Sequence, residues 1–353
     1  MNPGPGGVEG VAMLLAPDPR SPWRLPPPFA IEAPHVLSAV AATSPDDVWA
    51  VGQARGRPLA LHWNGSSWSV PPGPPSPAAL VGPGLEGVTA RRHSAATEVI
   101  AVGGAYDRLL GAEVPLLRHW DGAFWTDLAA PVLPGGTGVA RDYVLTDVTL
   151  VAPGRAWAVG HAFGRAARLV ALFWNGESWH VAEGLPDVPQ GKLLAVTGTS
   201  PHDVWATGAA GRSGLIVHFD GRTWRRSPSP TTRSPLTDVS AAAPDDVWCA
   251  GGGTVLRWNG RKWTRIKVPI GSVNTVTAVS PTNVWLGGAR GDLAHYDGHR
   301  WTWVPGPDEL RDTAVWQAST ATHPTGPTWM VGSRRTSDPV TASPHHTTTA
   351  HET

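Results

Sequence analysis

Two short phrases recur along the chain and limit what it can fold into. The first phrase reads "SPDDVWAVG" at 44–52 and returns in similar form at 200–208, 243–251 and 280–288. The second phrase reads "HWNGSSW" at 62–68 and has five further copies, at 119–125, 173–179, 218–224, 257–263 and 295–301. An Asn-Gly or Asp-Gly pair between apolar runs predicts a β-hairpin with a type I′ turn, in which both central residues have positive φ.

Each repeat therefore predicts four antiparallel strands, which we call a, b, c and d. A short apolar run (strand a) precedes the Pro-Asp turn, "VWAVG" forms strand b, and the second phrase supplies strands c and d. We expect the Asp side chains to bond nearby backbone amides and the Gly to end strand b. The slot occupied by Trp in strand b recurs at intervals of 37 to 57 residues, at Trp49, Ile100, Trp157, Trp205, Trp248, Trp285 and Trp329.

Seven units of this length match the blades of a β-propeller, so we predict an all-β, seven-bladed propeller of four-stranded antiparallel blades. A solenoid is the alternative. The seventh unit lacks strands c and d, whereas "GVAMLLAPDPRSPWRLPPP" near the N-terminus aligns with strands c and d of the first unit. Residues of about 10–30 are thus expected to complete the last blade, with Trp23 in its outer strand. A ring closed in this way has no open sheet edges, which favours the propeller over the solenoid.

The predicted domain spans residues 1–332, and the Thr- and Ser-rich segment 333–353 is expected to be a disordered tail. Over about Gly10–Gly332 the paired phrases resemble the tryptophan-rich bacterial propellers grouped with kelch-type or galactose-oxidase-like domains. This resemblance implies a fold more than an activity, because such propellers serve many functions. Repetition itself indicates that the phrases are structural, since similar active sites at seven equivalent places are not expected.

Composition narrows the class of partner. Acidic and basic residues balance at 28 each, so no overall field draws the protein to nucleic acid or to a membrane. No apolar run approaches the roughly 18 residues of a membrane span, and the N-terminus does not resemble a signal peptide. We therefore expect a soluble, cytoplasmic monomer, with secretion left open.

A copper-radical enzyme of the galactose-oxidase kind needs a Cys joined to a Tyr and further His and Tyr ligands, and we reject this activity because one cysteine and three tyrosines do not supply that set. The single cysteine, Cys249, lies in predicted strand b where the first repeat has Ala50, so we expect it in the core. The repeated histidines (His62, His119, His218 and His295) belong to separate blades and are expected to be packed or hydrogen-bonded strand residues of those blades. Sialidase-type hairpins are rejected because the chain lacks the matching Arg, Tyr and Glu pattern. No metal and no cofactor is predicted.

The loops differ between repeats and are the first candidate site. Six of the predicted b–c loops carry arginine, and the candidate rim residues are Arg55, Arg57, Arg108, Arg165, Arg168, Arg212, Arg290 and Arg334. Because equivalent loops of neighbouring blades point the same way, we expect these groups on one face, where they would favour an anionic ligand. Ordinary loop solubility is the alternative explanation.

The channel side of strand a is the second candidate site. Its polar candidates are Glu86, Asp147, Asp238 and Asn274, and Trp316 interrupts a column of Ala41, Thr89, Thr149, Thr197, Ser240 and Thr277. An aromatic side chain there would plug the channel or stack a ligand.

With no recognisable nucleophile or metal motif, the sequence favours a non-catalytic scaffold that binds a protein, peptide or anionic small molecule at the b–c loop face. Two alternatives stay open: an enzyme (lyase, cyclase or hydrolase) with its site at the channel mouth, and a carbohydrate-binding lectin. A deep pocket with a buried, perturbed carboxylate would favour the enzyme.

Overall fold

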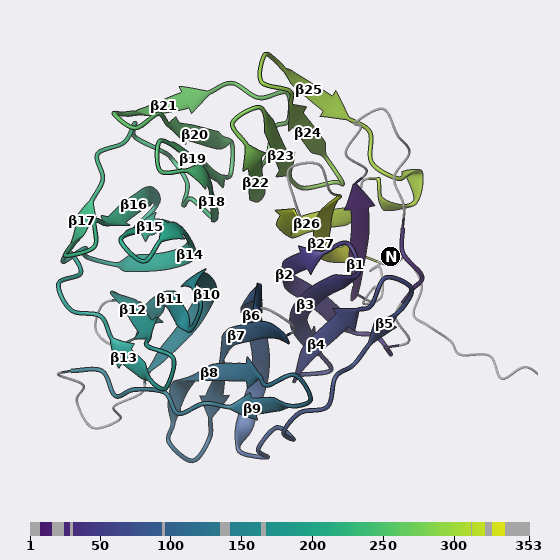
Figure 1. The fold of residues 1–353 in the computed structure, drawn as a ribbon, viewed down its shortest axis with the longest axis vertical. Coiled ribbons are helices and arrows are strands. Elements are labelled where there is room, and N and C mark those ends of the chain that lie inside the picture. Colours follow the sequence, from purple (N-terminus) through teal and green to yellow (C-terminus); the bar gives the residue numbers. More distant parts are fainter. Residues whose placement is uncertain are drawn as a thin grey trace, which may run out of the picture.

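The strands form seven antiparallel sheets that stand around a central channel (Figure 1). The computed structural model describes residues 8–15, 25–28, 31–93, 96–134, 142–163, 167–311, 313–321 and 327–335. In each sheet the first strand of the unit lies at the channel and the following strands lie progressively outward (Figure 1). The fold is a seven-bladed β-propeller, as the sequence predicts.

The first three blades follow one another along the chain. Blade one contains β2 (His35–Ser44), β3 (Asp47–Ala54), β4 (Arg57–Trp63) and β5 (Trp68–Ser69). Blade two contains β6 (Leu80–His93), β7 (Ala96–Asp107), β8 (Ala112–Trp120) and β9 (Trp125–Asp127). Blade three contains β10 (Tyr143–Ala152), β11 (Arg155–Ala162), β12 (Arg168–Trp174) and β13 (Trp179–Val181).

The next three blades repeat the same order. Blade four contains β14 (Gly191–Ser200), β15 (Asp203–Ala210), β16 (Ser213–Phe219) and β17 (Trp224–Arg226). Blade five contains β18 (Asp238–Ala243), β19 (Asp246–Gly251), β20 (Thr254–Trp258) and β21 (Trp263–Ile266). Blade six contains β22 (Thr275–Ser280), β23 (Asn283–Gly287), β24 (Leu293–Tyr296) and β25 (Trp301–Val304), and a short 3-10 helix, η1 (Asp308–Leu310), follows it.

Blade seven joins the two ends of the chain. Its described strands are β26 (Ala314–Ala321), β27 (Thr328–Arg335) and β1 (Val8–Leu15), and β1 pairs antiparallel with β27 from Val8↔Arg335 to Leu15↔Thr328. The predicted closure of the ring by an N-terminal strand is thus confirmed, with β1 as the third strand. Of the predicted tail 333–353, residues 333–335 belong to β27 instead. Trp23 and residues 336–353 lie outside the described residues, so their predicted roles stay predictions.

Tryptophans pack the blades against one another. The strand-b tryptophans are all buried, as predicted, and Ile100 is buried in the same slot of blade two. Trp49 of blade one meets Trp125 of blade two edge-on, with ring centroids 5.5 Å apart. The same contact joins Trp329 of blade seven to Trp68 of blade one at 5.7 Å. Edge-to-face packing of this kind stabilises aromatic pairs beyond their buried area, so the same indole contact stabilises the closure of the ring and the junction of blades one and two.

The repeated glycine of strand b has a different role from the predicted one, because β3 continues past Gly52 to Ala54. Strand a has a bulge opposite this position, between Leu37 and Ala39. The bulge brings the Val36 carbonyl oxygen to 2.0 Å from where a Cβ on Gly52 would lie. Gly208 meets Lys192 in the same way. Only glycine leaves room for the bulged strand.

The c–d turns also differ from the predicted two-residue type I′ form. Residues 64–67 form a longer loop, in which Gly65 has a φ of 93° and Asn64 is not among the residues of positive φ. The Asn64 side-chain Oδ1 accepts the backbone N–H groups of Ser66 and Ser67, both at 3.0 Å. The Asn side chain therefore shapes the turn by hydrogen bonding rather than by adopting a left-handed backbone.

Candidate functional site

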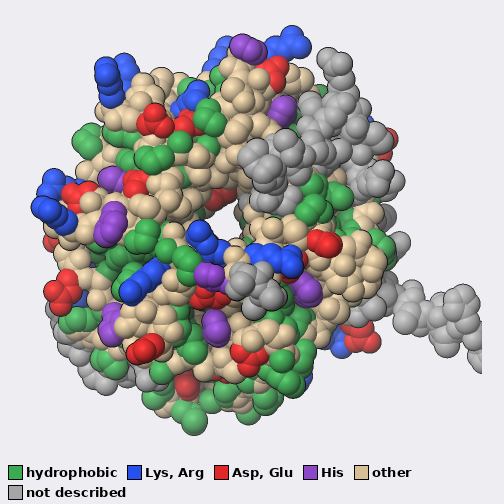
Figure 2. All heavy atoms as spheres, viewed as in Figure 1, with side chains coloured by type: hydrophobic (Ala, Val, Ile, Leu, Met, Phe, Trp, Pro, Cys, Tyr) green, Lys and Arg blue, Asp and Glu red, His purple; other side chains and the backbone are tan. Residues whose placement is uncertain are grey.

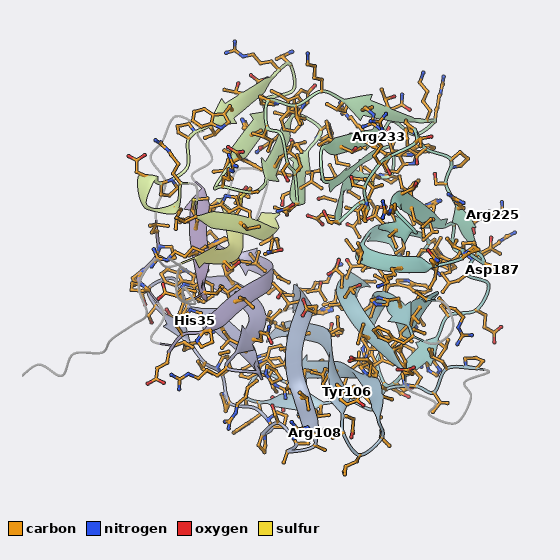
Figure 3. All side chains as sticks on the ribbon, turned by 180° about the vertical axis from the view of Figure 1, so that it is seen from behind. His35, Tyr106, Arg108, Asp187, Arg225 and Arg233 are labelled. Atoms are coloured by element: carbon orange, nitrogen blue, oxygen red, sulfur yellow. The ribbon has the colours of Figure 1, made fainter. Side chains whose placement is uncertain are left out.

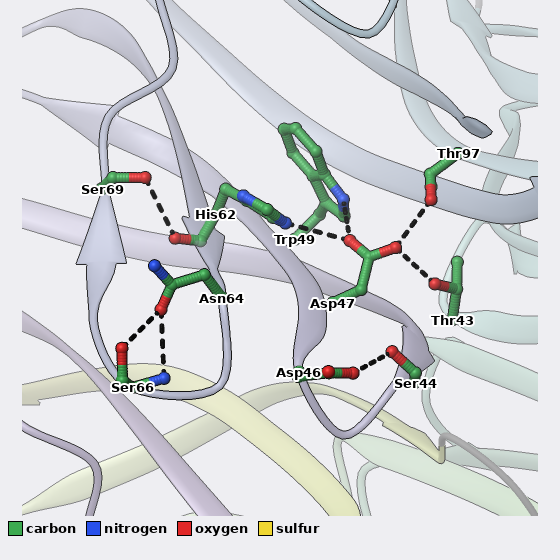
Figure 4. Close-up of polar contacts among 10 residues, drawn as sticks. All are labelled: Thr43, Ser44, Asp46, Asp47, Trp49, His62, Asn64, Ser66, Ser69 and Thr97. Atoms are coloured by element: carbon green, nitrogen blue, oxygen red, sulfur yellow. Dashed lines mark hydrogen bonds and ion pairs between the residues drawn. The ribbon is translucent and has the colours of Figure 1, made fainter. Parts of the chain in front are cut away.

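The second Asp of the repeated phrase forms hydrogen bonds with several neighbouring side chains (Figure 4). Asp47 Oδ1 accepts the indole N–H of Trp49 at 2.9 Å and contacts His62 Nε2 at 3.0 Å. Its other oxygen accepts the hydroxyls of Thr43, at 2.5 Å, and of Thr97 in blade two, at 2.7 Å. Burial pushes the pKa of Asp47 upward, but these four donors outweigh it and hold the pKa well below the usual range. The phrase is a structural network that joins a strand-b Trp, strand c and the next blade.

Other blades vary this network. Asp203 accepts Trp205 Nε1 at 3.1 Å and contacts His218 Nε2 at 2.7 Å. Blade six substitutes an Asn283–His295 contact of 3.0 Å, and blade five an ion pair between Arg257 Nε and Asp246 Oδ1 at 2.6 Å. The prediction that the repeated histidines bond within their own blades is confirmed for His62, His218 and His295. These residues are committed to the fold and are not a functional site.

The channel encloses a cavity of about 290 Å³ lined by strand a of all seven blades. Figure 2 shows the opening from one face, with Lys and Arg side chains beside it. Its lining includes the hydroxyls of Thr89, Thr149, Thr197 and Ser240, together with Glu86, Asp147 and Asp238. The cavity is therefore polar, and it contains the enclosed carboxylates expected of the enzyme alternative.

Asp147 and Asp238 clamp neighbouring blades. Asp147 Oδ1 accepts the N–H of Val148, and its Oδ2 accepts the N–H of Val196 in blade four, both at 2.8 Å. Asp238 accepts the N–H of Val276 and the hydroxyl of Thr275, both in blade six. Burial raises the pKa of Asp147 to about 7, with the nearby Asp238 adding to the rise, and burial raises the pKa of Asp238 to about 6.

In strand a of their own blades, Glu86 and Asn274 lie one position earlier than Asp147 and Asp238 do in theirs. Glu86 is the bulge residue of β6, between Leu85 and Gly87. Its side chain lines the channel cavity within the ring. Burial raises the pKa of Glu86, and a hydrogen bond from Ser38 opposes this rise. Asn274 donates from Nδ2 to the Trp316 carbonyl oxygen of blade seven at 3.2 Å. Glu86, Asp147 and Asp238 thus line the channel cavity, and Asp147, Asp238 and Asn274 each bond the next blade.

The predicted position of Trp316 is wrong. Trp316 pairs with Gly332, is fully buried, and packs in the core beside Met330 and Leu310. The column that it was expected to interrupt continues as Thr320, which pairs with Trp329 and lines the channel. The residue opposite Trp329 thus lies four positions after Trp316, so the predicted alignment of this strand was displaced by four residues. Trp316 therefore neither plugs the channel nor meets a ligand there.

The rim arginines lie on the loops between the second and third strands of their blades or, like Arg57, Arg168 and Arg334, at the strand ends beside them, and hence partway out along each blade rather than at the channel mouth. Two of them are neutralised. Arg55 Nη2 lies 2.5 Å from Glu32 Oε2, and Arg334 Nη2 lies 2.9 Å from Glu9 Oε2. Arg334 thus ties β27 to β1. Arg165 lies outside the described residues.

Five rim arginines remain available. Arg57, Arg108, Arg168, Arg212 and Arg290 are exposed, and within the described part of the chain none of them has an acidic partner within 4.0 Å. Charge is uneven around the ring, because residues 191–305 hold 13 Lys and Arg against 7 Asp and Glu, whereas residues 35–190 hold 10 against 13. Blades four to six are therefore the more basic side.

An apolar surface on blade two was not predicted. The loop between β7 and β8 exposes Tyr106, Leu109 and Leu110, and Figure 3 shows Tyr106 and Arg108 on this blade. A cavity of about 290 Å³ lies at its base. "YDRLLGAEVP" contains the signal, since two leucines occupy a loop, but a short apolar run does not reveal whether it is buried.

A larger cavity, of about 470 Å³, lies at the seam of blades one and seven. Its lining includes the Glu9–Arg334 ion pair, His35 and Leu310. Burial lowers the pKa of His35. The chain segments next to this lining, 16–24 and 29–30, lie outside the described residues, so no ligand chemistry is assigned to it.

Neither metal nor thiol chemistry is indicated by the described residues. Within them no group of three or more His, Cys, Asp or Glu side chains converges to hold a metal ion. Cys249 is fully buried in β19, as predicted, and burial raises the pKa of its thiol. None of the described residues belongs to a helix long and apolar enough to cross a membrane.

Comparison with known proteins shows the fold. No family model and no curated protein matches the sequence. The structure of YCF48 bound to D1 peptide matches with a TM-score of 0.57 at 14% identity, covering 98% of each chain. YCF48 from Cyanidioschyzon merolae matches at 0.57 and 15%, covering 92% of this chain and 97% of that one. The WD40 β-propeller domain of Doa1 matches at 0.56 and 8%, covering 84% and 93%. The chain is thus similar in fold to WD40-type propellers.

Proposed function

We propose that this propeller is a non-catalytic scaffold that holds a protein or peptide on the face formed by its b–c and d–a loops. The observation that carries the proposal is the contrast between a repeated scaffold and unlike loops. The repeated polar residues bond one another or the next blade, whereas five loop arginines point to solvent without an acidic partner among the described residues. One fold neighbour binds the D1 peptide, which supports a peptide partner by analogy only.

The chemistry of the loops favours an anionic contact surface. A guanidinium group matches a carboxylate with two parallel hydrogen bonds, and such charge-assisted bonds are stronger than neutral ones. Two of the rim arginines already form carboxylate pairs within the chain, Arg55 with Glu32 and Arg334 with Glu9. A partner carboxylate would reproduce that pairing at Arg57, Arg108, Arg168, Arg212 or Arg290.

The test uses two pools of synthetic nine-residue peptides, one rich in Asp and Glu and one with Lys in those places, with binding measured by fluorescence anisotropy. We expect the acidic pool alone to bind, and to bind less well at high salt, because partly exposed charges are screened. Replacing Arg57, Arg108, Arg212 and Arg290 together by Gln should remove this binding. Equal binding of both pools, or binding unaffected by the four substitutions, would show that the rim is only a solvated surface.

The enzyme alternative rests on a specific observation, the raised pKa of the channel carboxylates. Raised values are typical of catalytic acids, but they also arise in structural clusters. Asp147 and Asp238 each accept donors from the next blade, and that role explains their burial without catalysis. Turnover that survives purification and is lost in Glu86→Gln would favour the enzyme, because the hydrogen bond with Ser38 is the only contact identified for that side chain among the described residues.

Other sequence-based expectations stay predictions. The kelch-type or galactose-oxidase-like ancestry, a bacterial source, the cytoplasmic location, the monomeric state and the absence of nucleic-acid and membrane partners are compatible with a binding scaffold, which does not depend on them. A lectin is not proposed, because the strand-b tryptophans that might form sugar platforms are buried between blades.

A further inference from the structure

The loop of blade two between β7 and β8 carries the apolar surface most suited to a partner. Leu109 is 86% exposed at its tip, and Tyr106 and Leu110 beside it are 42% and 45% exposed. Arg108 lies between them in the sequence, on the same blade in Figure 3. Tyr and Arg are enriched among the residues that dominate binding energies, and an exposed apolar cluster costs solubility unless it is covered.

This loop is held in shape before any partner arrives. The Asp107 side-chain Oδ1 accepts the N–H groups of Leu109 and Leu110, at 2.8 and 3.2 Å, and its backbone oxygen accepts that of Gly111 at 2.8 Å. The N–H of Arg108 bonds the Ala79 carbonyl oxygen in the link from blade one, at 3.0 Å. A surface fixed in this way loses little conformational entropy when it binds.

A cavity of about 290 Å³ opens at the base of the loop, between blades one and two. Its lining is largely apolar and includes Pro58 and Pro77 on the blade-one side and Leu110 and Leu128 on the blade-two side. A volume at or below the roughly 300 Å³ lower limit for small-molecule pockets suits one or two side chains rather than a whole ligand. The cavity thus fits a side-chain anchor.

Two arginines adjoin this cavity in the chain. Arg57 precedes the lining residue Pro58, and Arg108 lies between the lining residues Asp107 and Leu110. Both are exposed, whereas Arg118 in the wall is already paired with Asp127, at 2.8 Å. A carboxylate next to the buried side chain of a partner would meet these two guanidinium groups.

Addition of a partner strand to β8 is disfavoured. The outer strand β9 pairs with β8 only from Arg118 to Trp120, which leaves the other half of β8 without a strand beside it. However, the N–H of Glu113 is taken by the Asp142 side chain at 3.3 Å, and Pro115 has no N–H to donate. A backbone N–H already bonded to a side chain and a proline both prevent pairing with a further strand. Recognition here therefore depends on side chains rather than on strand pairing.

We propose that the cavity between blades one and two binds a leucine-sized side chain of a protein partner, and that Arg57 and Arg108 pair with a carboxylate next to it. The inference rests on the proposed function, because it names the anchor on the same face. It also places the anchor on the less basic half of the ring, so shape and apolar area, rather than overall charge, select the position.

The test is a selection of random nine-residue peptides displayed on phage against the full chain, followed by anisotropy with the selected peptides. We expect those peptides to share a Leu, Ile or Met beside Asp or Glu. Leu110→Asp and Arg108→Gln should each weaken binding roughly tenfold or more. Arg222→Gln, an equally exposed change in the c–d turn of blade four and outside the rim, is the matched control and should have no effect, whereas Arg212→Gln tests the rest of the rim. Circular dichroism of each variant confirms that the ring is intact.

The other outcomes separate the two proposals. Peptides weakened by Arg212→Gln but not by Leu110→Asp would overturn the anchor and keep the binding face. Selected peptides whose binding is unaffected by Leu110→Asp, Arg108→Gln and Arg212→Gln would overturn both the anchor and the proposed binding face. The absence of any enriched peptide would also overturn both. Self-association of the chain that Leu109→Ser abolishes would identify the loop as a contact between copies, which also overturns the anchor.

Discussion

Replacing Asp47 by Ala should destabilise the ring far more than the same change at its neighbour Asp46. Asp47 accepts four side-chain donors, and its own side chain is only 14% exposed. Asp46 is solvent-exposed, and its side chain is contacted by the Ser44 hydroxyl. The pair therefore compares two adjacent carboxylates in one turn, of which only one bonds the core.

The magnitude follows from what the missing carboxylate leaves behind. Trp49 is 2% exposed, so its indole N–H would be buried without a partner, at a cost of about 1–3 kcal/mol. His62, Thr43 and Thr97 are reached by water and would lose about 0.5–1.5 kcal/mol each. The total is about 2.5–7.5 kcal/mol in the free energy of unfolding. Asp46→Ala should leave the unfolding midpoint unchanged.

The assay is urea unfolding followed by tryptophan fluorescence, at a series of pH values. The pKa of Asp47 is depressed in the fold, so its contribution is complete above the unfolded value of about 4 and is lost as the pH falls through the folded value. The gap between Asp47→Ala and the parent should thus be constant from neutral pH down to about pH 5 and narrow below about pH 4. A midpoint for Asp47→Ala equal to that of Asp46→Ala at neutral pH would refute this account of the network.

Three further outcomes are expected. Deleting residues 1–15 removes β1 and exposes the edge of β27, so the protein should unfold at lower urea or associate in sedimentation analysis; an unchanged monomer of unchanged midpoint would contradict ring closure. Burial raises the pKa of Asp147 to about 7, so its charged form becomes a cost as the pH rises; the stability of Asp147→Asn relative to the parent should improve between pH 5 and about pH 8, and a difference independent of pH would contradict the burial. Cys249 should react with a thiol reagent only after unfolding, and rapid labelling of the native protein would show that β19 opens.

The fold could be predicted from the sequence because its determinants are local and repeated. The Trp of strand b and the Asn-Gly or Asp-Gly turn recur in unit after unit, so each copy supports the reading of the others. The closure by β1 could also be predicted, because the last unit lacks strands c and d and an N-terminal segment resembles those strands. In these respects periodicity reports directly on which residues are buried.

Features that depend on the register between neighbouring strands could not be predicted from the sequence. Bulges in strand a, such as the one between Leu37 and Ala39, shift its pairing with strand b, and the partner of Trp329 is Thr320 rather than Trp316. No pattern in one strand shows where its neighbour bulges. The glycine of strand b was misread for the same reason, since its cause lies in the adjacent strand.

The candidate site was only partly predictable. The rim arginines stand out in the sequence, yet the pairing of Arg55 with Glu32 depends on a contact between separate loops. The exposed leucines of blade two could not be recognised as a surface from the sequence, because a short apolar run does not show whether it is buried. Exposure is a property of the assembled ring rather than of the segment.

The pairing of β1 with β27 has a consequence for how the protein is made. β1 precedes every other described strand, and its partner follows more than 300 residues later, as the pair Val8↔Arg335 shows. A strand that leaves the ribosome first must therefore wait, unpaired, until six blades have been synthesised. Closing a loop of that length is an entropically costly and slow step. We therefore expect blade seven to form last, when β1 pairs with β27. During this interval the nascent chain presents two complementary sheet edges, and helper proteins that shield such edges would act on it then.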